Sequence, residues 1–134
     1  MNWYKAAQSE TFSCTGTLRY AGDNWAVLDV DQGMCDFYRN MIPKANFVRP
    51  QMYPAHITVV RLGREEISNP EFWGKYEGEQ VSFTYTNEIK KCPPYYCMSV
   101  QSPRLEEIRT ELGLPPVRSG YEAFHITLGN FKDL

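Results

Sequence analysis

AHITVVRL at residues 55–62 and AFHITL at residues 123–128 contain the same tripeptide, His-Ile-Thr. These copies hold both histidines of the chain, His56 and His125, which lie 69 residues apart. Both segments are rich in β-branched residues and are followed by a glycine, so each is predicted to be a strand. A tripeptide duplicated on two strands indicates an internal repeat.

Side chains alternate between the two faces of a strand. His56 and Thr58 therefore share one face, while Ile57 projects from the other. The same holds for His125 and Thr127 in the second copy. If the two halves of the chain face each other, two imidazoles and two hydroxyls converge on one spot.

The remaining elements occur in a similar order in each half of the chain. Alternating and β-branched segments predict strands at residues 11–20, 25–30, 80–86 and 95–101, with turns at 21–24 and 90–94. Apolar residues at helical spacing predict a helix at 32–41, from Met34, Phe37, Tyr38 and Met41, and a second at 103–112, from Leu105, Ile108 and Leu112. Short helical turns are expected at 65–76.

This order of elements predicts a single α+β domain over residues 1–134. We expect a bilobal fold with pseudo-two-fold symmetry, in which two antiparallel sheets face a central cleft and carry their helices outside. An apolar fraction of 43% is enough for a packed core and excludes a disordered chain.

The charge of the chain limits its ligands. Fourteen Lys and Arg against sixteen Asp and Glu give a net charge of −2, whereas proteins that hold long nucleic acids are usually basic. A long nucleic acid partner is therefore not expected. A small anionic ligand needs only a few local cations and stays compatible with this charge.

Membrane, metal and export signals are not expected. Residues 1–10 are polar and contain no apolar core of a signal peptide, and no window approaches the roughly 20 apolar residues of a membrane span. The four cysteines (Cys14, Cys35, Cys92 and Cys97) form no C-x-x-C pair and have no His at zinc-ligand spacing. We expect reduced thiols in a cytoplasmic protein without cofactor or metal, although the sequence also permits a Cys92–Cys97 disulfide.

The two His-x-Thr copies suit the chemistry of a phosphodiester. Two histidines with ordinary pKa values near 6.5 can divide the proton transfers, one as base and one as acid. Threonine hydroxyls can donate hydrogen bonds to the non-bridging phosphate oxygens. There are two alternatives. The histidines could be buried side chains with only a structural role, or they could share a metal ion, although no carboxylate accompanies the motifs as a further ligand.

Paired H-x-T motifs on strands of two similar lobes resemble the signature of the 2H phosphoesterase superfamily. The resemblance implies catalytic roles for His56, Thr58, His125 and Thr127. Within the superfamily the short, acidic chain, its T-G-T-L-R-Y hairpin and its motif spacing are similar to the phage anti-CBASS enzymes, which degrade cyclic di- and trinucleotide alarm signals. The implied reaction is metal-independent opening of a 3′–5′ linkage through a 2′,3′-cyclic phosphate. Which histidine is the base, and the oligomeric state, are left open.

Further residues are candidates for substrate binding because of their type and their place on predicted strands or loops. Aromatic rings can stack on bases, and guanidinium groups can pair with phosphate. The candidates are Trp25, Tyr20, Tyr85 and Tyr121 for stacking, and Arg19 and Arg61 for phosphate. Arg61 is an odd number of residues from His56, so it reaches the same face only if a bulge redirects it.

Two other functions remain open. An RNA 2′,3′-cyclic phosphodiesterase or 2′–5′ ligase-like enzyme would use the same four motif residues. A non-catalytic sponge for cyclic nucleotides would need the aromatic and arginine side chains without both histidines. Substrate tests and histidine substitutions separate these possibilities.

Overall fold

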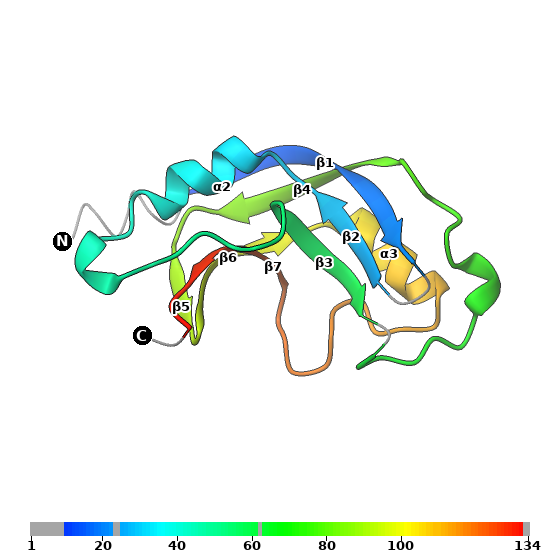
Figure 1. The fold of residues 1–134 in the computed structure, drawn as a ribbon. Helices are drawn as coiled ribbons and strands as arrows, with labels where there is room; N and C mark the ends of the chain where they lie inside the picture. The colour runs from blue at the N-terminus through cyan, green and yellow to red at the C-terminus, as the bar shows by residue number, and fades with distance from the viewer. Residues whose placement is uncertain (1–9, 23–24, 62, 133–134) are drawn as a thin grey trace.

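The computed structural model describes residues 10–22, 25–61 and 63–132, and six of its strands form one closed antiparallel sheet (Figure 1). The ring runs β4–β1–β2–β3–β7–β6, and a further pairing of β6 with β4 closes it. These strands are β1 (Thr11–Ala21), β2 (Trp25–Asp29), β3 (His56–Arg61), β4 (Gln80–Thr86), β6 (Tyr95–Gln101) and β7 (Phe124–Asn130). A short strand, β5 (Lys90–Cys92), pairs with β6 outside this ring.

The chain repeats one unit twice. Two strands, a helix and a third strand make the first half (β1, β2, α2, β3), and the same order makes the second half (β4, β6, α3, β7). The halves join where β3 pairs with β7 and where β1 pairs with β4. The predicted α+β class is therefore confirmed.

The predicted arrangement of two facing sheets is not confirmed, because one continuous sheet forms instead. In two separate sheets, the strands at the lobe edges would leave backbone N–H and C=O groups unpaired. The β3–β7 and β1–β4 pairings satisfy those groups and merge the two sheets into a barrel.

Each half carries one α-helix with a side-chain cap. Helix α2 (Gln32–Arg39) begins after Asp31, whose carboxylate accepts a hydrogen bond from the Met34 N–H at 3.1 Å. Helix α3 (Pro103–Glu111) begins after Ser102, whose hydroxyl accepts from the Leu105 N–H at 3.3 Å. In the view of Figure 1, α2 lies at the upper left and α3 at the right.

One core of buried apolar side chains joins the strands and both helices. It includes Leu18, Leu28, Ile57, Phe83, Met98, Ile126 and Leu128 from the strands, and Cys35, Tyr38, Leu105, Ile108 and Leu112 from α2, α3 and the C-cap of α3. Alternation along the strands places these side chains on one face. The opposite face carries polar groups together with buried Val27 and Cys97.

Several local predictions need correction. Residues 90–92 form β5 within the predicted turn, because pairing with β6 orders a three-residue segment that has no apolar pattern of its own. Helix α2 ends at Arg39, and Phe37 and Met41 are 60% and 58% exposed, so the predicted apolar face is only partly buried. Within 65–76 the helical turn is η2 (Pro70–Phe72), and a second one, η1 (Lys44–Asn46), was not predicted.

Some predictions concern residues outside the described ranges. These are the turn residues 23–24, the end of the predicted strand at residue 62, and most of the N-terminal segment at 1–10. All four cysteines carry free thiols, and the Cys97 thiol lies 2.7 Å from that of Cys92. Among the described helices, none has the length and apolar character needed to cross a membrane.

Candidate active site

The two His-Ile-Thr motifs meet at the centre of the β3–β7 pairing. Ile57 is the register partner of Ile126, and both side chains are fully buried. Because the strands are antiparallel, the histidine of each motif lies opposite the threonine of the other. All four polar side chains are half-buried and project from the face opposite the isoleucines. Diagonal neighbours on such a face lie roughly 7–8 Å apart, so both imidazoles reach a group bound between them.

Each motif is followed by a β-bulge. The register of β3 against β2 skips Val59, and the register of β7 against β6 skips Leu128. Each of these residues directly follows a motif threonine. A bulge bends the strand and increases its twist, so the two motifs lie before equivalent bends of the two halves.

A pocket lies on each side of the paired motifs. The first pocket is lined by His56 and Thr127. The second pocket is lined by Thr58 and His125. Each pocket therefore receives one histidine and one threonine, and these come from different motifs.

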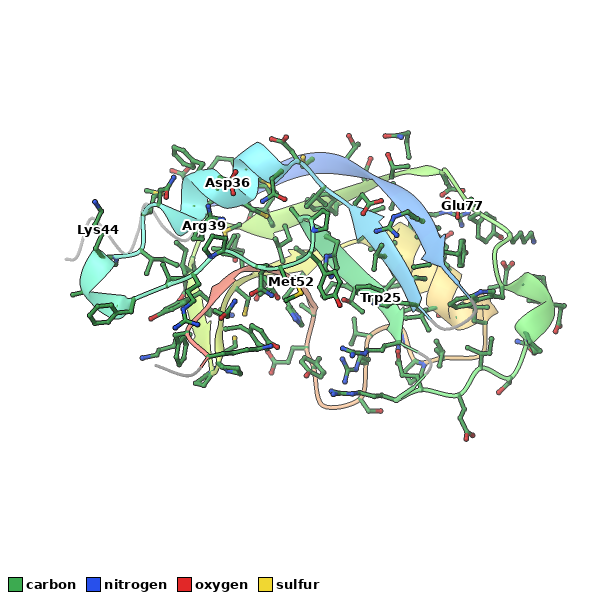
Figure 2. The ribbon with its side chains drawn as sticks, viewed as in Figure 1. Trp25, Asp36, Arg39, Lys44, Met52 and Glu77 are labelled. Atoms are coloured by element: carbon green, nitrogen blue, oxygen red, sulfur yellow. The ribbon has the colours of Figure 1, made fainter. Side chains whose placement is uncertain are left out.

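A hydrogen bond and an aromatic cluster orient the His56 ring. Its Nδ1 lies 2.8 Å from the carbonyl oxygen of Pro54, and since a carbonyl only accepts, Nδ1 carries the proton. The Trp25 ring meets the imidazole edge-on at 5.3 Å, and Tyr53 meets Trp25 at 5.8 Å. Figure 2 shows Trp25 near the segment that carries Met52. This arrangement leaves Nε2 as the His56 atom that exchanges protons with a ligand.

His125 has a different environment. Its ring stacks on Tyr121 at 5.8 Å with an interplanar angle of 20°, and the guanidinium of Arg118 lies 4.9 Å from the same tyrosine ring. Burial lowers the pKa of the His125 imidazole, and the positive charges of Arg118 and His56 lower it further. The neutral, proton-accepting form of His125 is therefore favoured near neutral pH.

The family of the chain follows from this site and from a match over most of its length. The model described as "Swiss Army Knife, 2H phosphoesterase domain" matches residues 26–133. The chain belongs to the 2H phosphoesterases. A search of curated proteins and a search of solved structures gave no match.

Membership confirms the resemblance at the level of the superfamily and makes the protein a phosphoesterase, with a phosphodiester hydrolase or ligase-type activity. The paired H-x-T motifs on β3 and β7 are the residues that carried this resemblance. The four catalytic roles that it implies remain predictions, and the geometry brings all four side chains together.

Three arginines line the pockets of this 2H phosphoesterase, and two of them are paired with carboxylates. In the first pocket, Arg39 contacts Asp36 at 2.8 Å (Figure 2). In the second, the fully buried Arg109 contacts Glu65 at 2.7 Å. The third, Arg118, has no salt bridge within the described part of the chain.

Arg109 also supports the bulge beside the second pocket. It donates to the carbonyl oxygen of Val59, the bulge residue, at 2.7 Å, and to that of Pro115 at 2.9 Å. Glu65 in turn accepts from the backbone N–H of Arg61 at 3.1 Å. The buried pair therefore links helix α3, the bulge on β3 and the loop that leads to the second motif.

Three of the predicted substrate-binding residues lie at the site. Tyr121 lines the second pocket, and Trp25 contacts His56. Arg61 is the register partner of Trp25 beyond the bulge, and directly paired residues share a face. The bulge therefore gives Arg61 the orientation that its sequence spacing alone would not.

The other three predicted substrate-binding residues make contacts within the protein. Arg19 donates to the carboxylate of Asp29 at 2.8 and 3.1 Å. Tyr20 packs edge-on against Trp73 at 5.0 Å. Tyr85 is buried in the core, where its hydroxyl lies 3.2 Å from that of Tyr38 and where burial raises its pKa. None of these three lines either pocket.

Sequence reasoning did not single out Arg118 or Tyr53. Both lie in the loops that lead into the motifs, Tyr53 three residues before His56 and Arg118 seven residues before His125. Their position upstream of a repeated motif is the signal that points to them. Among residues 10–22, 25–61 and 63–132, no three His, Cys, Asp or Glu side chains gather as a metal site requires.

Proposed function

We propose that this 2H phosphoesterase hydrolyses the 3′–5′ linkages of cyclic di- and trinucleotides to linear products without a metal ion. The observation that carries the proposal is the crosswise pairing of the motifs between two pockets. Each pocket combines a histidine, a threonine and an aromatic ring, Tyr53 in the first and Tyr121 in the second. A phosphodiester has one nucleoside on each side of its phosphorus, which fits this arrangement.

The chemistry requires one proton acceptor and one proton donor. In the first step, one histidine takes the proton of the ribose 2′-OH and the bond between O2′ and phosphorus forms. The bond from phosphorus to the 5′-oxygen breaks as the other histidine protonates that oxygen. The products of this step are a 2′,3′-cyclic phosphate and a free 5′-OH.

The second step returns both histidines to their starting forms. The histidine that gave its proton now takes one from water, which attacks phosphorus. The histidine that received a proton gives it to the 2′-oxygen as the cyclic phosphate opens. During both steps Thr58 and Thr127 donate hydrogen bonds to non-bridging oxygens, where negative charge increases in the transition state.

A compact substrate fits the distribution of charge better than a long nucleic acid does. The net charge is −2, and two of the three arginines that line the pockets are neutralised by carboxylates. A long RNA needs cations along an extended groove, whereas a cyclic dinucleotide needs them only at the site.

The biological role that we propose is removal of the cyclic nucleotides that bacteria use as alarm signals in antiphage defence. The protein would then be of phage origin and act in the cytoplasm of the infected cell. This role is supported by the resemblance of the chain to the phage anti-CBASS enzymes.

One observation favours RNA ends as a second candidate substrate. At the β5–β6 hairpin, Lys91 lies 5.1 Å from the ring of Phe131, and Lys132 lies 4.9 Å from that of Tyr95. Alternating cations and aromatic rings suit single-stranded RNA, whose bases stack on such rings. An RNA ending in a 2′,3′-cyclic phosphate is therefore the appropriate competitor in any test.

The experiment compares 3′,3′-cyclic GMP-AMP with that RNA in the presence of EDTA, with products separated by chromatography. His56→Ala and His125→Ala test the mechanism, and Lys44→Gln, on exposed η1, is the surface control. Conversion of the cyclic dinucleotide to a linear product, lost in both histidine variants, is the expected result. Opening of the RNA end alone would replace the proposed substrate. Binding without turnover, retained in His56→Ala, would favour a cyclic-nucleotide sponge.

A further inference from the structure

The backbone of the site has approximate two-fold symmetry, but the groups beside the two histidines differ. On β2, which pairs with β3, the register partner of His56 is Asp29. On β6, which pairs with β7, the register partner of His125 is Ser99. A carboxylate that is itself paired with Arg19 at 2.8 Å therefore lies next to one imidazole, and a hydroxyl lies in the equivalent place next to the other.

The two pockets also differ in their arginines. In the first pocket the charge of Arg39 is neutralised by Asp36, 2.8 Å away. In the second pocket Arg118 is half-buried, lies over the ring of Tyr121, and makes no salt bridge with any residue that the structure describes. The second pocket therefore holds a positive charge that its counterpart lacks.

The charges of Glu65 and Arg118 interact, but the Glu65 carboxylate is already paired with Arg109 and makes no salt bridge with Arg118. Arg109 is neutralised by Glu65, and Lys90 donates to the Ser99 hydroxyl at 3.2 Å, which adds a cation on the β6 side. The charged and titratable groups on the elements around His125 are thus Arg118 and Tyr121 from the preceding loop, Lys90 from β5 and the Arg109–Glu65 pair, together with His56 and Arg61 from β3.

We propose that Arg118 is a positioning residue that makes this two-histidine site directional. It keeps His125 neutral, as the base that takes the 2′-OH proton, and leaves His56 as the acid that protonates the 5′-oxygen. This assignment rests on the proposed function. A cation beside His125 disfavours the imidazolium there, while the Pro54 carbonyl holds His56 with Nε2 toward the substrate.

The assignment also orients the substrate. The nucleoside that supplies the attacking 2′-OH occupies the second pocket, with Tyr121 and Arg118. The nucleoside that leaves through its 5′-oxygen occupies the first pocket, with Tyr53. Each pocket then holds a different nucleoside of the same linkage.

The first test measures the histidines directly and needs no substrate. Since the chain has only two histidines, NMR titration of the imidazole C–H signals follows both, and the signal lost in His125→Ala assigns them. We expect the pKa of His125 to rise in Arg118→Gln and to remain close to the wild-type value in Arg118→Lys. Lys44→Gln removes the same charge at a distant exposed site (Figure 2) and is expected to change nothing. A His125 titration that is unchanged in Arg118→Gln would overturn the proposal.

The same variants give a kinetic readout that a merely structural role would not move. Loss of the Arg118 charge shifts the acidic limb of the pH profile of kcat/KM to higher pH, because the base is then protonated over a wider range. Arg118→Lys restores the limb. An unchanged limb together with a uniform loss of activity would indicate only a structural role and would contradict the proposal.

The second test identifies the acid. In 3′,3′-cyclic GMP-AMP with sulfur in place of the bridging 5′-oxygens, the leaving thiolate needs no proton. His56→Ala should therefore recover most of the roughly 10²- to 10⁴-fold loss expected on the oxygen substrate, while His125→Ala should not. Rescue of His125→Ala instead, or of neither variant, would overturn the assignment. If the wild-type protein leaves the oxygen substrate intact, the proposed function fails, and the NMR titration still decides whether Arg118 controls His125.

Discussion

The two halves of the barrel share one backbone plan but differ in the charged groups around it. Each half places a His-Ile-Thr strand beside the other and follows it with a bulge of one residue. In the first half Arg39 is paired with Asp36, and Asp29 beside His56 is paired with Arg19. The second half has Arg118 and the buried Arg109–Glu65 pair. Strand pairing therefore sets where the four motif side chains lie, and residues outside the two motif strands set the charge around each histidine.

The largest expected effect comes from removing either imidazole. His56→Ala and His125→Ala should each lower kcat by about 10²- to 10⁴-fold, since each removes one partner of a coupled proton transfer. Combining them should cost little more than either alone, because the groups act as a unit. Steady-state kinetics of the three variants checks this. Multiplicative losses would mean that the two halves act independently.

The next largest effect is on the free energy of unfolding, and it differs between the ion pairs of the two pockets. Arg109 is fully buried and leaves a buried carboxylate when removed, so Arg109→Met should lower the free energy of unfolding by about 3–5 kcal/mol. Arg39→Met breaks a pair whose Asp36 carboxylate is well exposed and should cost far less.

Urea denaturation of both variants measures the difference. The doubly substituted Arg109→Met with Glu65→Leu should recover much of the loss, because no uncompensated charge then remains buried. Equal costs for Arg109→Met and Arg39→Met would show that the buried pair does not hold the second half together.

A smaller effect is expected on KM, and it should differ between Tyr121 and Tyr85, which the sequence analysis both predicted to bind substrate. Tyr121 lines the second pocket, so Tyr121→Ala should raise KM for the cyclic dinucleotide about tenfold, as expected for loss of one stacked base. Tyr85→Phe only breaks the 3.2 Å contact with Tyr38 in the core. It should leave KM unchanged and lower the free energy of unfolding by about 1 kcal/mol. A raised KM in Tyr85→Phe would indicate that Tyr85 contacts the substrate and would contradict this assignment.

The smallest effect concerns stability in acid. Burial alone would raise the pKa of Glu65, but hydrogen bonds from the Arg109 side chain and the Arg61 backbone outweigh it and lower the pKa below its ordinary value. A carboxylate with a depressed pKa stabilises the fold above the unfolded-state pKa, and this stabilisation is lost as the pH falls through the folded-state value. The Glu65 contribution should therefore disappear below about pH 4.

Denaturation midpoints measured from pH 7 to pH 3 test this. Glu65→Gln should lose stability at pH 7 and show a flatter pH dependence, while Glu66→Gln, an exposed neighbour, should follow the wild type. Parallel curves for the wild type and Glu65→Gln would contradict the role given to this pair.

The strands and the placement of the four motif side chains could be predicted because their signals are local. The alternation of QVSFTYT gives β4 with its observed bounds, and the period of two in His-Ile-Thr places each histidine with its threonine. Asp31 as a cap and Pro103 as a first helical residue mark the two helix starts. Each of these features depends on a few adjacent residues.

The closure of the sheet and the charges of the site could not be predicted, because they depend on contacts between distant segments. No local pattern in the sequence of β1 indicates that this strand pairs with β4. Tyr85 has the alternation of an ordinary strand residue, and only the position of Tyr38 shows that its hydroxyl lies in the core. Arg118 lies in a loop without regular structure, and its relation to His125 exists only in the folded chain.

The central Ile57–Ile126 pair has a consequence for how such a site can arise. Consider a His-Ile-Thr strand that pairs antiparallel with a copy of itself, with the two isoleucines as register partners. Each histidine then lies opposite the threonine of the other copy. A symmetric dimer of a single half would therefore display the same four side chains without any further adjustment. Duplication and fusion of that half would preserve the reactive face, and each half would then be free to acquire its own neighbours, as Asp29 and Arg118 illustrate.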